Sequence, residues 1–302
     1  MTKRIPLQIR IQTARWSRLK IGLTIIAALI LLAWLVSLAL RFPVLRVGTI
    51  ALIKLDAPVV VSGDNLLGRT LKSEDVVKLV KEVGRARGIV GLLIEINSPG
   101  GSAVATAEIA EAISRINKSK VALIREIGAS GAYWIASAAD VVVAHPMSIT
   151  GSIGVRGSYL EFAGLLREWN ISYQQLVAGR LKEAGVPWKE LTDEERALLQ
   201  SALDKVYEEF VAAIAANRNL SLEQVRQLAD GRFFLGSEAK ELGLVDELGG
   251  RERAMEILKQ LTNQTELELI EYAVRRPLLE RLREIRTGGL ESSFARTPVI
   301  WV

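Results

Sequence analysis

The sequence of 302 residues lacks cysteine and contains a single histidine, His145. The absence of cysteine excludes disulfides, thiolate catalysis and cysteine-ligated metal sites. One histidine cannot form a histidine-rich metal site, and any Ser-His-Asp triad would depend on that residue alone. If the chain is a hydrolase, we therefore expect a general base other than histidine.

Acidic residues are missing from the first 46 positions, which hold eight of the 39 basic residues of the chain. The other 31 basic residues are accompanied by 34 acidic ones, so the excess of positive charge is confined to the N-terminus. A protein that binds nucleic acid through its folded part usually carries a basic surface there. We therefore predict no nucleic-acid partner.

Charge is also missing from Ile21 to Leu40, and a helix of that length spans about 30 Å, the thickness of a bilayer core. Six basic residues precede this run, which predicts a cytoplasmic basic segment (1–20), a single-pass anchor in membrane lipid (21–40) and an extracytoplasmic domain. A cleaved signal peptide is an alternative because Ser37 and Ala39 form a small-x-small pattern. Its apolar part is normally shorter, about 7 to 15 residues. A core helix is disfavoured because the run is apolar on every face.

Beyond Pro43, continuous apolar runs alternate with amphipathic segments, which is typical of an α/β layered domain whose strands are covered on both faces. We expect this domain to occupy residues 41–274 and to be followed by a charged helix and tail at 275–302. The expected strands are 47–55, 89–96, 121–127, 141–144, 171–177 and 267–272. The expected helices are 73–84 with Ser73 as N-cap, 102–116, 132–139, a long helix to Arg218 opened by the capping box of Thr192 and Glu195, and a shorter one opened by Ser221 and Gln224.

Two glycine-containing loops follow buried strands, where α/β sheets usually bind their ligands. In Ser98-Pro99-Gly100-Gly101-Ser102, the paired glycines allow backbone N–H groups to approach an oxyanion, although the loop could equally be a tight turn. In Gly128-Ala129-Ser130-Gly131-Ala132, a serine stands among residues of minimal size, as in a nucleophile elbow. A simple N-cap serine is the competing interpretation.

A serine nucleophile needs a base, and a neutral lysine amine can serve. Free lysine has a pKa of about 10.4, so only about one in 2500 is neutral at pH 7. Burial or a neighbouring cation would have to lower that pKa by about 3.4 units to make half of the amines neutral. These residues alone do not indicate which lysine meets the condition.

Five ordered motifs together resemble the signal peptide peptidase A (SppA) family in its short, single-repeat form. They are Asn97-Ser98-Pro99-Gly100-Gly101, the run from Gly128 to Asp140, Thr150-Gly151-Ser152-Ile153-Gly154-Val155, Ala178-Gly179-Arg180-Leu181-Lys182-Glu183 and Ala229-Asp230-Gly231-Arg232. The resemblance covers roughly residues 47 to 250 and implies a layered βαβ domain of the Clp-protease/crotonase-like fold.

The resemblance also implies a serine endopeptidase with a Ser-Lys dyad that degrades cleaved signal peptides and other exposed apolar segments. Ser130 matches the nucleophile, Lys182 the general base and Ser152 the hydroxyl that orients the base. The N–H groups of Gly101 and Gly131 match the oxyanion hole. The resemblance implies no metal, nucleotide or other cofactor. In short-form members the subunits form a homo-oligomeric ring, an octamer in the family, with active sites shared between protomers.

The sequence departs from the family pattern at two positions. Arg180 stands two residues before Lys182, where a small residue or lysine is expected, and His145 stands where Asn or Asp is usual. We interpret His145 as a loop residue. A catalytically inactive membrane scaffold of the same fold and a crotonase-like acyl-CoA enzyme remain alternatives, although no catalytic carboxylate pair is evident at the loops.

Overall fold

The computed structural model of the chain describes residues 24–34, 37, 47–62 and 70–273. The chain divides into two compact units, Met1–Arg46 and Val47–Val302. In the first unit, residues 24–34 are helical and their side chains are exposed. No helix within the described ranges is both long enough and apolar enough to cross a bilayer. The expected span at 21–40 lies partly outside the described residues, and the segments 1–20 and 275–302 lie wholly outside them.

The second unit is built on one large, mainly parallel sheet with strand order β10-β1-β4-β5-β6-β9, and β7 joins β5 to β8. The strands of this sheet are β1 (Val47–Leu55), β4 (Ile89–Ser98), β5 (Ser119–Ala129), β6 (Val141–Ala144), β7 (Ile149–Gly151), β8 (Phe233–Leu235), β9 (Glu247–Leu248) and β10 (Glu266–Glu271). A two-stranded ribbon adds β2 (Val59–Val60) and β3 (Leu71–Lys72). The β7–β8 pair is antiparallel, whereas the other pairs are parallel.

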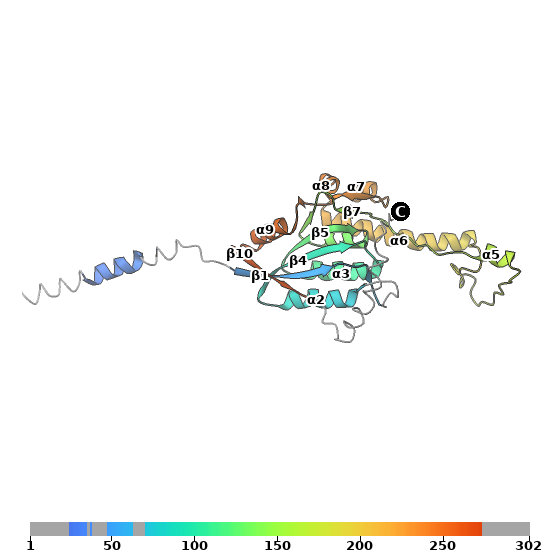
Figure 1. Ribbon diagram of the computed structural model, residues 1–302, viewed down its shortest axis with the longest axis horizontal. Coiled ribbons are helices and arrows are strands. Elements are labelled where there is room, and N and C mark those ends of the chain that lie inside the picture. Colours follow the sequence, from blue (N-terminus) through green and yellow to red (C-terminus); the bar gives the residue numbers. More distant parts are fainter. Residues whose placement is uncertain (1–23, 35–36, 38–46, 63–69, 274–302) are drawn as a thin grey trace, which may run out of the picture. The chain divides into compact units, whose positions relative to one another are not determined.

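Helices cover both faces of the sheet (Figure 1). They are α2 (Ser73–Arg85), α3 (Ala103–Arg115), α4 (Gly131–Ser137), α5 (Ala163–Glu168), α6 (Asp193–Arg218), α7 (Leu222–Leu228), α8 (Gly236–Glu241) and α9 (Arg251–Thr262). The larger core lies between the sheet and α2, α3, α4 and α6, and the smaller core lies between the sheet and α9. Successive residues of β4 alternate between them, with Leu92 and Ile94 in the larger core and Leu93 in the smaller. Burial on both faces explains why the strands are continuous apolar runs.

The α/β class with a parallel sheet is confirmed, and this architecture fits the Clp-protease-like expectation. The strands at 47–55 and 141–144 have the bounds expected from the sequence, and β4, β5 and β10 lie within two residues of theirs. The capping boxes also form: the Thr192 side chain accepts from the Glu195 N–H, and the Ser221 side chain accepts from the Gln224 N–H.

Two local expectations are wrong. Ser73 does not cap α2, because Lys72 occupies the N-cap position and the Ser73 hydroxyl donates to Glu108 of α3 at 2.5 Å. Residues 171–177 form no strand, and their side chains are exposed. A short segment with apolar residues at both ends forms a strand only if a sheet edge is available to pair with it, and this segment lies beside α5, away from the sheet (Figure 1).

Candidate active site

Ser130 lies between the end of β5 and the start of α4, with a main-chain φ of 53° and ψ of −126°. Residues other than glycine rarely adopt this conformation, and such strain is concentrated at functional sites. The Ser130 N–H donates to the Gly151 carbonyl of β7 at 2.8 Å, which holds the turn in place. Ser130 is the N-cap of α4 by position, but its side chain makes no capping hydrogen bond. The hydroxyl is therefore not used to stabilise the helix.

The loop after β4 lies directly against the loop that carries Ser130. A Cβ placed on Gly100, whose φ is +107°, would lie 2.8 Å from the Gly131 nitrogen and 3.1 Å from the Ser130 Cβ. The same loop pairs with β2 through Val59. The Val59 N–H donates to the Gly100 carbonyl, and the Ser102 N–H donates to the Val59 carbonyl, both at 2.9 Å. Because these two bonds come from the residues on either side of Gly101, the Gly101 N–H points away from β2. The fold thus brings the two glycine loops together.

Gly131 is the first residue of α4, so its N–H has no acceptor within the helix. Thr106 of α3 lies beneath it, and a Cβ on residue 131 would collide with the Thr106 hydroxyl. Thr106 is fully buried, and its hydroxyl oxygen has no hydrogen-bond partner in the described part of the chain. The sequence did not indicate that Thr106 would lie beneath Gly131, because Thr106 is on the apolar face of a helix and its spacing is that of a core residue.

Ser152 follows β7 and also has a left-handed backbone, with φ of 49°. Its N–H donates to the Arg232 carbonyl at 2.8 Å, and its hydroxyl donates to the Gly231 carbonyl at 3.3 Å. These contacts join the third and fifth family motifs at the end of β7. The Ser152 hydroxyl makes no bond to a lysine amine within the described chain.

Lys182 lies in an arm, defined here as residues 156–190, which includes α5. Its side chain is exposed, and its N–H donates to the Gly179 carbonyl at 3.0 Å. The arm is fixed to the first turn of α6 by the ion pairs Arg180–Glu194 and Lys189–Glu195, the second at 2.6 Å. Arg180, which departs from the family pattern, thus forms an ion pair with Glu194 of α6.

Helix α6 separates the arm from Ser130. Near its other end, Phe210 stacks on Trp134 of α4 with ring centroids 4.8 Å apart. Glu194 and Phe210 are 16 residues apart, about 24 Å along the helix at 1.5 Å per residue. Figure 1 shows α5 beyond the N-terminal end of α6, at the far end of that helix from the sheet. Within one chain, the structure does not bring Lys182 to Ser130.

His145 lies in the exposed loop after β6, where its Nδ1 accepts from the Met147 N–H at 3.2 Å. This position agrees with its interpretation as a loop residue. Among the residues that the structure describes, no group of three or more His, Cys, Asp or Glu side chains could hold a metal ion.

A model of peptidase family S49 matches residues 112–265, which include Ser130, Ser152 and Lys182 but not Gly101. This match covers half of the sequence. The chain belongs to peptidase family S49. The resemblance to the SppA family is thereby confirmed.

Relatives in three organisms support this assignment. A protein of Methanocaldococcus jannaschii provisionally named as a protease is 36% identical over 66% of this chain and 64% of its own length. An Enterococcus faecium protein provisionally named as signal peptide peptidase SppA is 35% identical over 64% of this chain and 57% of its own length. A Synechocystis protein provisionally named as a protease is 38% identical over 71% of this chain and 77% of its own length. The chain thus spans less than two thirds of the length of the first two relatives.

Proposed function

We propose that the chain is a serine endopeptidase in which Ser130 is the nucleophile and Lys182 of a neighbouring subunit is the general base. The main-chain conformation of Ser130, in a turn that lies against the Gly100 loop, is the observation that carries this proposal. It leaves the serine hydroxyl free of helix capping, next to the Gly131 N–H, which has no acceptor within α4. We assign the two oxyanion donors to the N–H groups of Gly131 and Gly101. Membership in a peptidase family supports the same reaction.

In the proposed reaction, the Ser130 oxygen attacks the scissile carbonyl carbon while the Lys182 amine accepts the hydroxyl proton. The tetrahedral oxyanion accepts hydrogen bonds from the Gly101 and Gly131 N–H groups. The Lys182 ammonium then donates its proton to the departing amine, which leaves an ester of Ser130. Water, deprotonated by the same amine, hydrolyses that ester. The reaction needs no metal or other cofactor.

The position of the arm supports a base supplied by a second copy of the chain. Lys182 lies in the arm at the N-terminal end of α6, and about 24 Å of that helix separates the arm from the part of α6 that packs near Ser130 of the same chain. The arm also exposes large apolar side chains, including Leu160 at 73%, Trp169 at 66% and Leu176 at 95% of their area. Such a surface is typical of a protein interface. A ring of subunits would cover this surface. It would bring Lys182, on the arm of one copy, to Ser130 of the next copy. Ser152 of that second copy would then orient the Lys182 amine.

We further propose that residues 21–40 anchor the chain in a membrane, with the N-terminus cytoplasmic and the second unit extracytoplasmic. The uncharged run, the basic residues before it and the helix at 24–34 with exposed apolar side chains support the anchor. Retention of the chain by membranes washed with alkaline carbonate, and its release when residues 1–46 are removed, would test this. Release of the full-length chain would contradict it.

The proposed substrates are extended apolar peptides, including cleaved signal peptides. Exposed apolar side chains lie on elements beside the site, with Val104 on α3 and Phe233 and Leu235 on β8. A membrane anchor would hold the enzyme where such peptides remain after secretion. Cleavage of a synthetic signal peptide, with products identified by mass spectrometry, would test this substrate class.

Mixing two inactive variants tests the shared dyad. Ser130→Ala and Lys182→Ala should each abolish peptide cleavage while the protein stays assembled. When the two variants are co-expressed, part of the activity should return, because some sites combine an intact Ser130 with a neighbour's intact Lys182. Full activity of either single variant would refute its catalytic role. An absence of rescue in mixed assemblies would refute a base supplied in trans.

Two alternatives differ in their assays. A crotonase-like acyl-CoA enzyme would hydrolyse or convert acyl-CoA thioesters but not peptides. An inactive scaffold of the same fold would cleave neither substrate, and a fluorophosphonate probe would leave its Ser130 unlabelled.

A further inference from the structure

Strand β5 changes its neighbours just before it reaches Ser130. Up to Ile124 it pairs with β6, whereas from Ile127 onward it pairs with β7. On its other side, Ile96 of β4 lies opposite Ile124, but Ser98 lies opposite Gly128. Two steps along β4 therefore correspond to four steps along β5. The extra residues form a bulge, and bulges beside active sites change the direction of the residues that follow.

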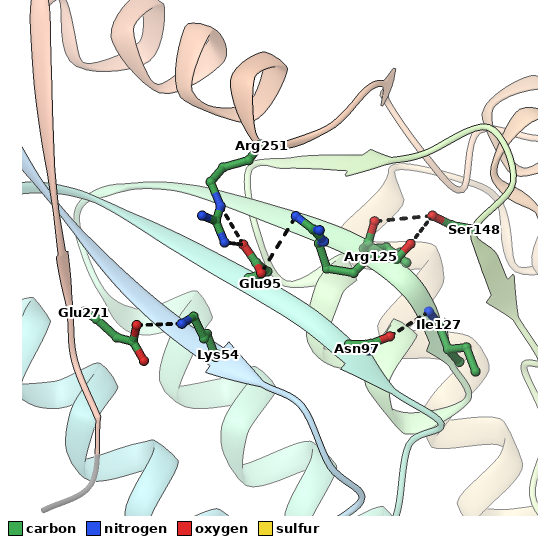
Figure 2. A network of polar contacts seen from close by, with 9 residues as sticks. Lys54, Glu95, Asn97, Arg125, Ile127, Ser148, Arg251 and Glu271 are labelled. Atoms are coloured by element: carbon green, nitrogen blue, oxygen red, sulfur yellow. Dashed lines mark hydrogen bonds and ion pairs between the residues drawn. The ribbon is translucent and has the colours of Figure 1, made fainter. Parts of the chain in front are cut away.

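Residues 125–127 have no partner in the ladder with β4, and residues 125 and 126 have none in the ladders with β6 and β7 either, so their backbone groups need other partners. Asn97, on β4, accepts a hydrogen bond from the Ile127 N–H through its side-chain oxygen at 3.1 Å. Ser148 is 1% exposed, and its hydroxyl donates to the Arg125 carbonyl, with the Ile124 carbonyl at 3.3 Å. Figure 2 shows both side chains reaching β5 from the neighbouring strand ends.

Charged groups hold the same bulge from the side of α9. Glu95 of β4 is only 13% exposed and accepts from Arg251 of α9 at 2.7 and 2.9 Å, while Arg125 of the bulge lies 3.9 Å away (Figure 2). These residues line a cleft of about 630 Å³ together with Lys54, which pairs with Glu271 at 2.6 Å. Because carboxylates match these cations, we interpret the network as a brace for β5 and not as an anion site.

The segment after the bulge carries the proposed nucleophile. Its register is fixed by the pairing of Gly128 with Thr150 and of Ala129 with Gly151, and the Ser130 N–H then bonds to the Gly151 carbonyl. The corresponding segment of β4 leads directly into the loop of Gly101. A bulge of a different size would shift Ser130 along the sheet with respect to that loop.

We infer that Asn97 and Ser148 are positioning residues, which fix the β5 bulge and so set the register of Ser130 against the oxyanion hole. Asn97 acts through the Ile127 N–H, and Ser148 acts through the Arg125 carbonyl. This inference rests on the proposed function, because the register of β5 matters for catalysis only if Ser130 is the nucleophile. Neither residue contacts the reacting atoms.

Substitutions at Asn97 separate this role from a general effect on stability. Asn97→Asp keeps an oxygen acceptor for the Ile127 N–H, whereas Asn97→Leu has nearly the same size and no acceptor. In the full-length protein, Asn97→Leu should lower kcat for peptide cleavage about tenfold, the rate equivalent of one lost hydrogen bond, with little change in KM. Asn97→Asp should stay close to wild type. Ser148→Ala should lower kcat in the same way.

Amide hydrogen exchange supplies a readout that does not depend on activity. Exchange at Ile127 should be faster in Asn97→Leu than in wild type and unchanged in Asn97→Asp. Asn117→Leu, an exposed substitution near the opposite end of β5, is the matched control and should alter neither exchange at Ile127 nor kcat. If Asn97→Leu does not fold, kcat of Ser148→Ala and amide exchange at Ile127 in Asn97→Asp still test the positioning role.

The two proposals fail in different ways. Wild-type kcat in both Asn97→Leu and Ser148→Ala, or equal losses in Asn97→Leu and Asn97→Asp, would overturn the positioning role. Wild-type cleavage by Ser130→Ala would instead overturn the proposed function. The rate at which a fluorophosphonate labels Ser130 should follow kcat across the Asn97 variants, since both depend on the same register.

Discussion

A methyl group on Gly101 should disable the site without unfolding the domain. A Cβ at this position would lie 2.7 Å from the Val59 nitrogen and 2.8 Å from the Val59 carbonyl carbon, and closer still to the carbonyl oxygen. Ordinary contacts of a Cβ begin at 3.4 Å. The obstacle is backbone and not the end of a flexible side chain. In Gly101→Ala the loop must therefore move away from β2 by about 1 Å or more, because the contact with the Val59 carbonyl oxygen is the shortest of the three.

That movement carries the Gly101 N–H away from the oxyanion it is proposed to bind. A displacement of about 1 Å in a catalytic group can cost about 100-fold in rate, and loss of one oxyanion donor costs about 100- to 1000-fold. We therefore expect kcat of Gly101→Ala to fall about 100-fold, which corresponds to about 2.7 kcal/mol of transition-state stabilisation. KM should change little, because the N–H group acts mainly on the charged intermediate.

The assay is cleavage of an apolar peptide, with Gly88→Ala as the matched control. Gly88 lies in the loop before β4, and a Cβ there would meet no atom within 4 Å. The control should keep wild-type kcat. Gly101→Ala with wild-type kcat would refute both the position of the oxyanion hole and the reasoning from the contact with β2.

Two further predictions concern the supports of the site and the arm. Thr150→Val should lower the free energy of unfolding by about 1 to 3 kcal/mol in urea titrations, because it removes the buried 2.8 Å bond from the Thr150 hydroxyl to the Gly128 carbonyl; an unchanged value would contradict it. The hydrogen bond from the Lys189 ammonium, with that from the Thr192 N–H, lowers the pKa of Glu195 below its usual 4.5. Ionised Glu195 therefore stabilises the fold above that pH, and the urea midpoint of wild type should exceed that of Glu195→Gln at pH 7, with the difference shrinking as the pH falls below 4.5.

The sequence indicated the main strands and the two glycine loops because each rests on local information. A continuous apolar run between turn residues identifies a buried strand such as β1, and small residues around Ser130 identify a turn with little room for side chains. Capping boxes are equally local, and the one at Thr192 forms as expected.

The expectations that failed, and the features that the sequence did not reveal, depend on distant partners. Ser73 looked like a helix cap, but its hydroxyl reaches Glu108 on another helix. The β5 bulge is invisible in a single strand, because it exists only as a mismatch with β4, and Asn97 gains its role from that mismatch. The distance between Lys182 and Ser130 likewise depends on the length of α6 and on where the arm is attached to it.

The pairing of β1 with β10 has a consequence for biosynthesis. Val47 lies opposite Glu266, and the ladder continues to Leu52 and Glu271, so the first strand of the described residues is completed by the last one among them. Until the ribosome has released residue 271, one side of β1 offers unpaired N–H and C=O groups along an apolar strand. Such an open side can capture other nascent chains. A chaperone that shields it during elongation should therefore raise the yield of correctly folded protein.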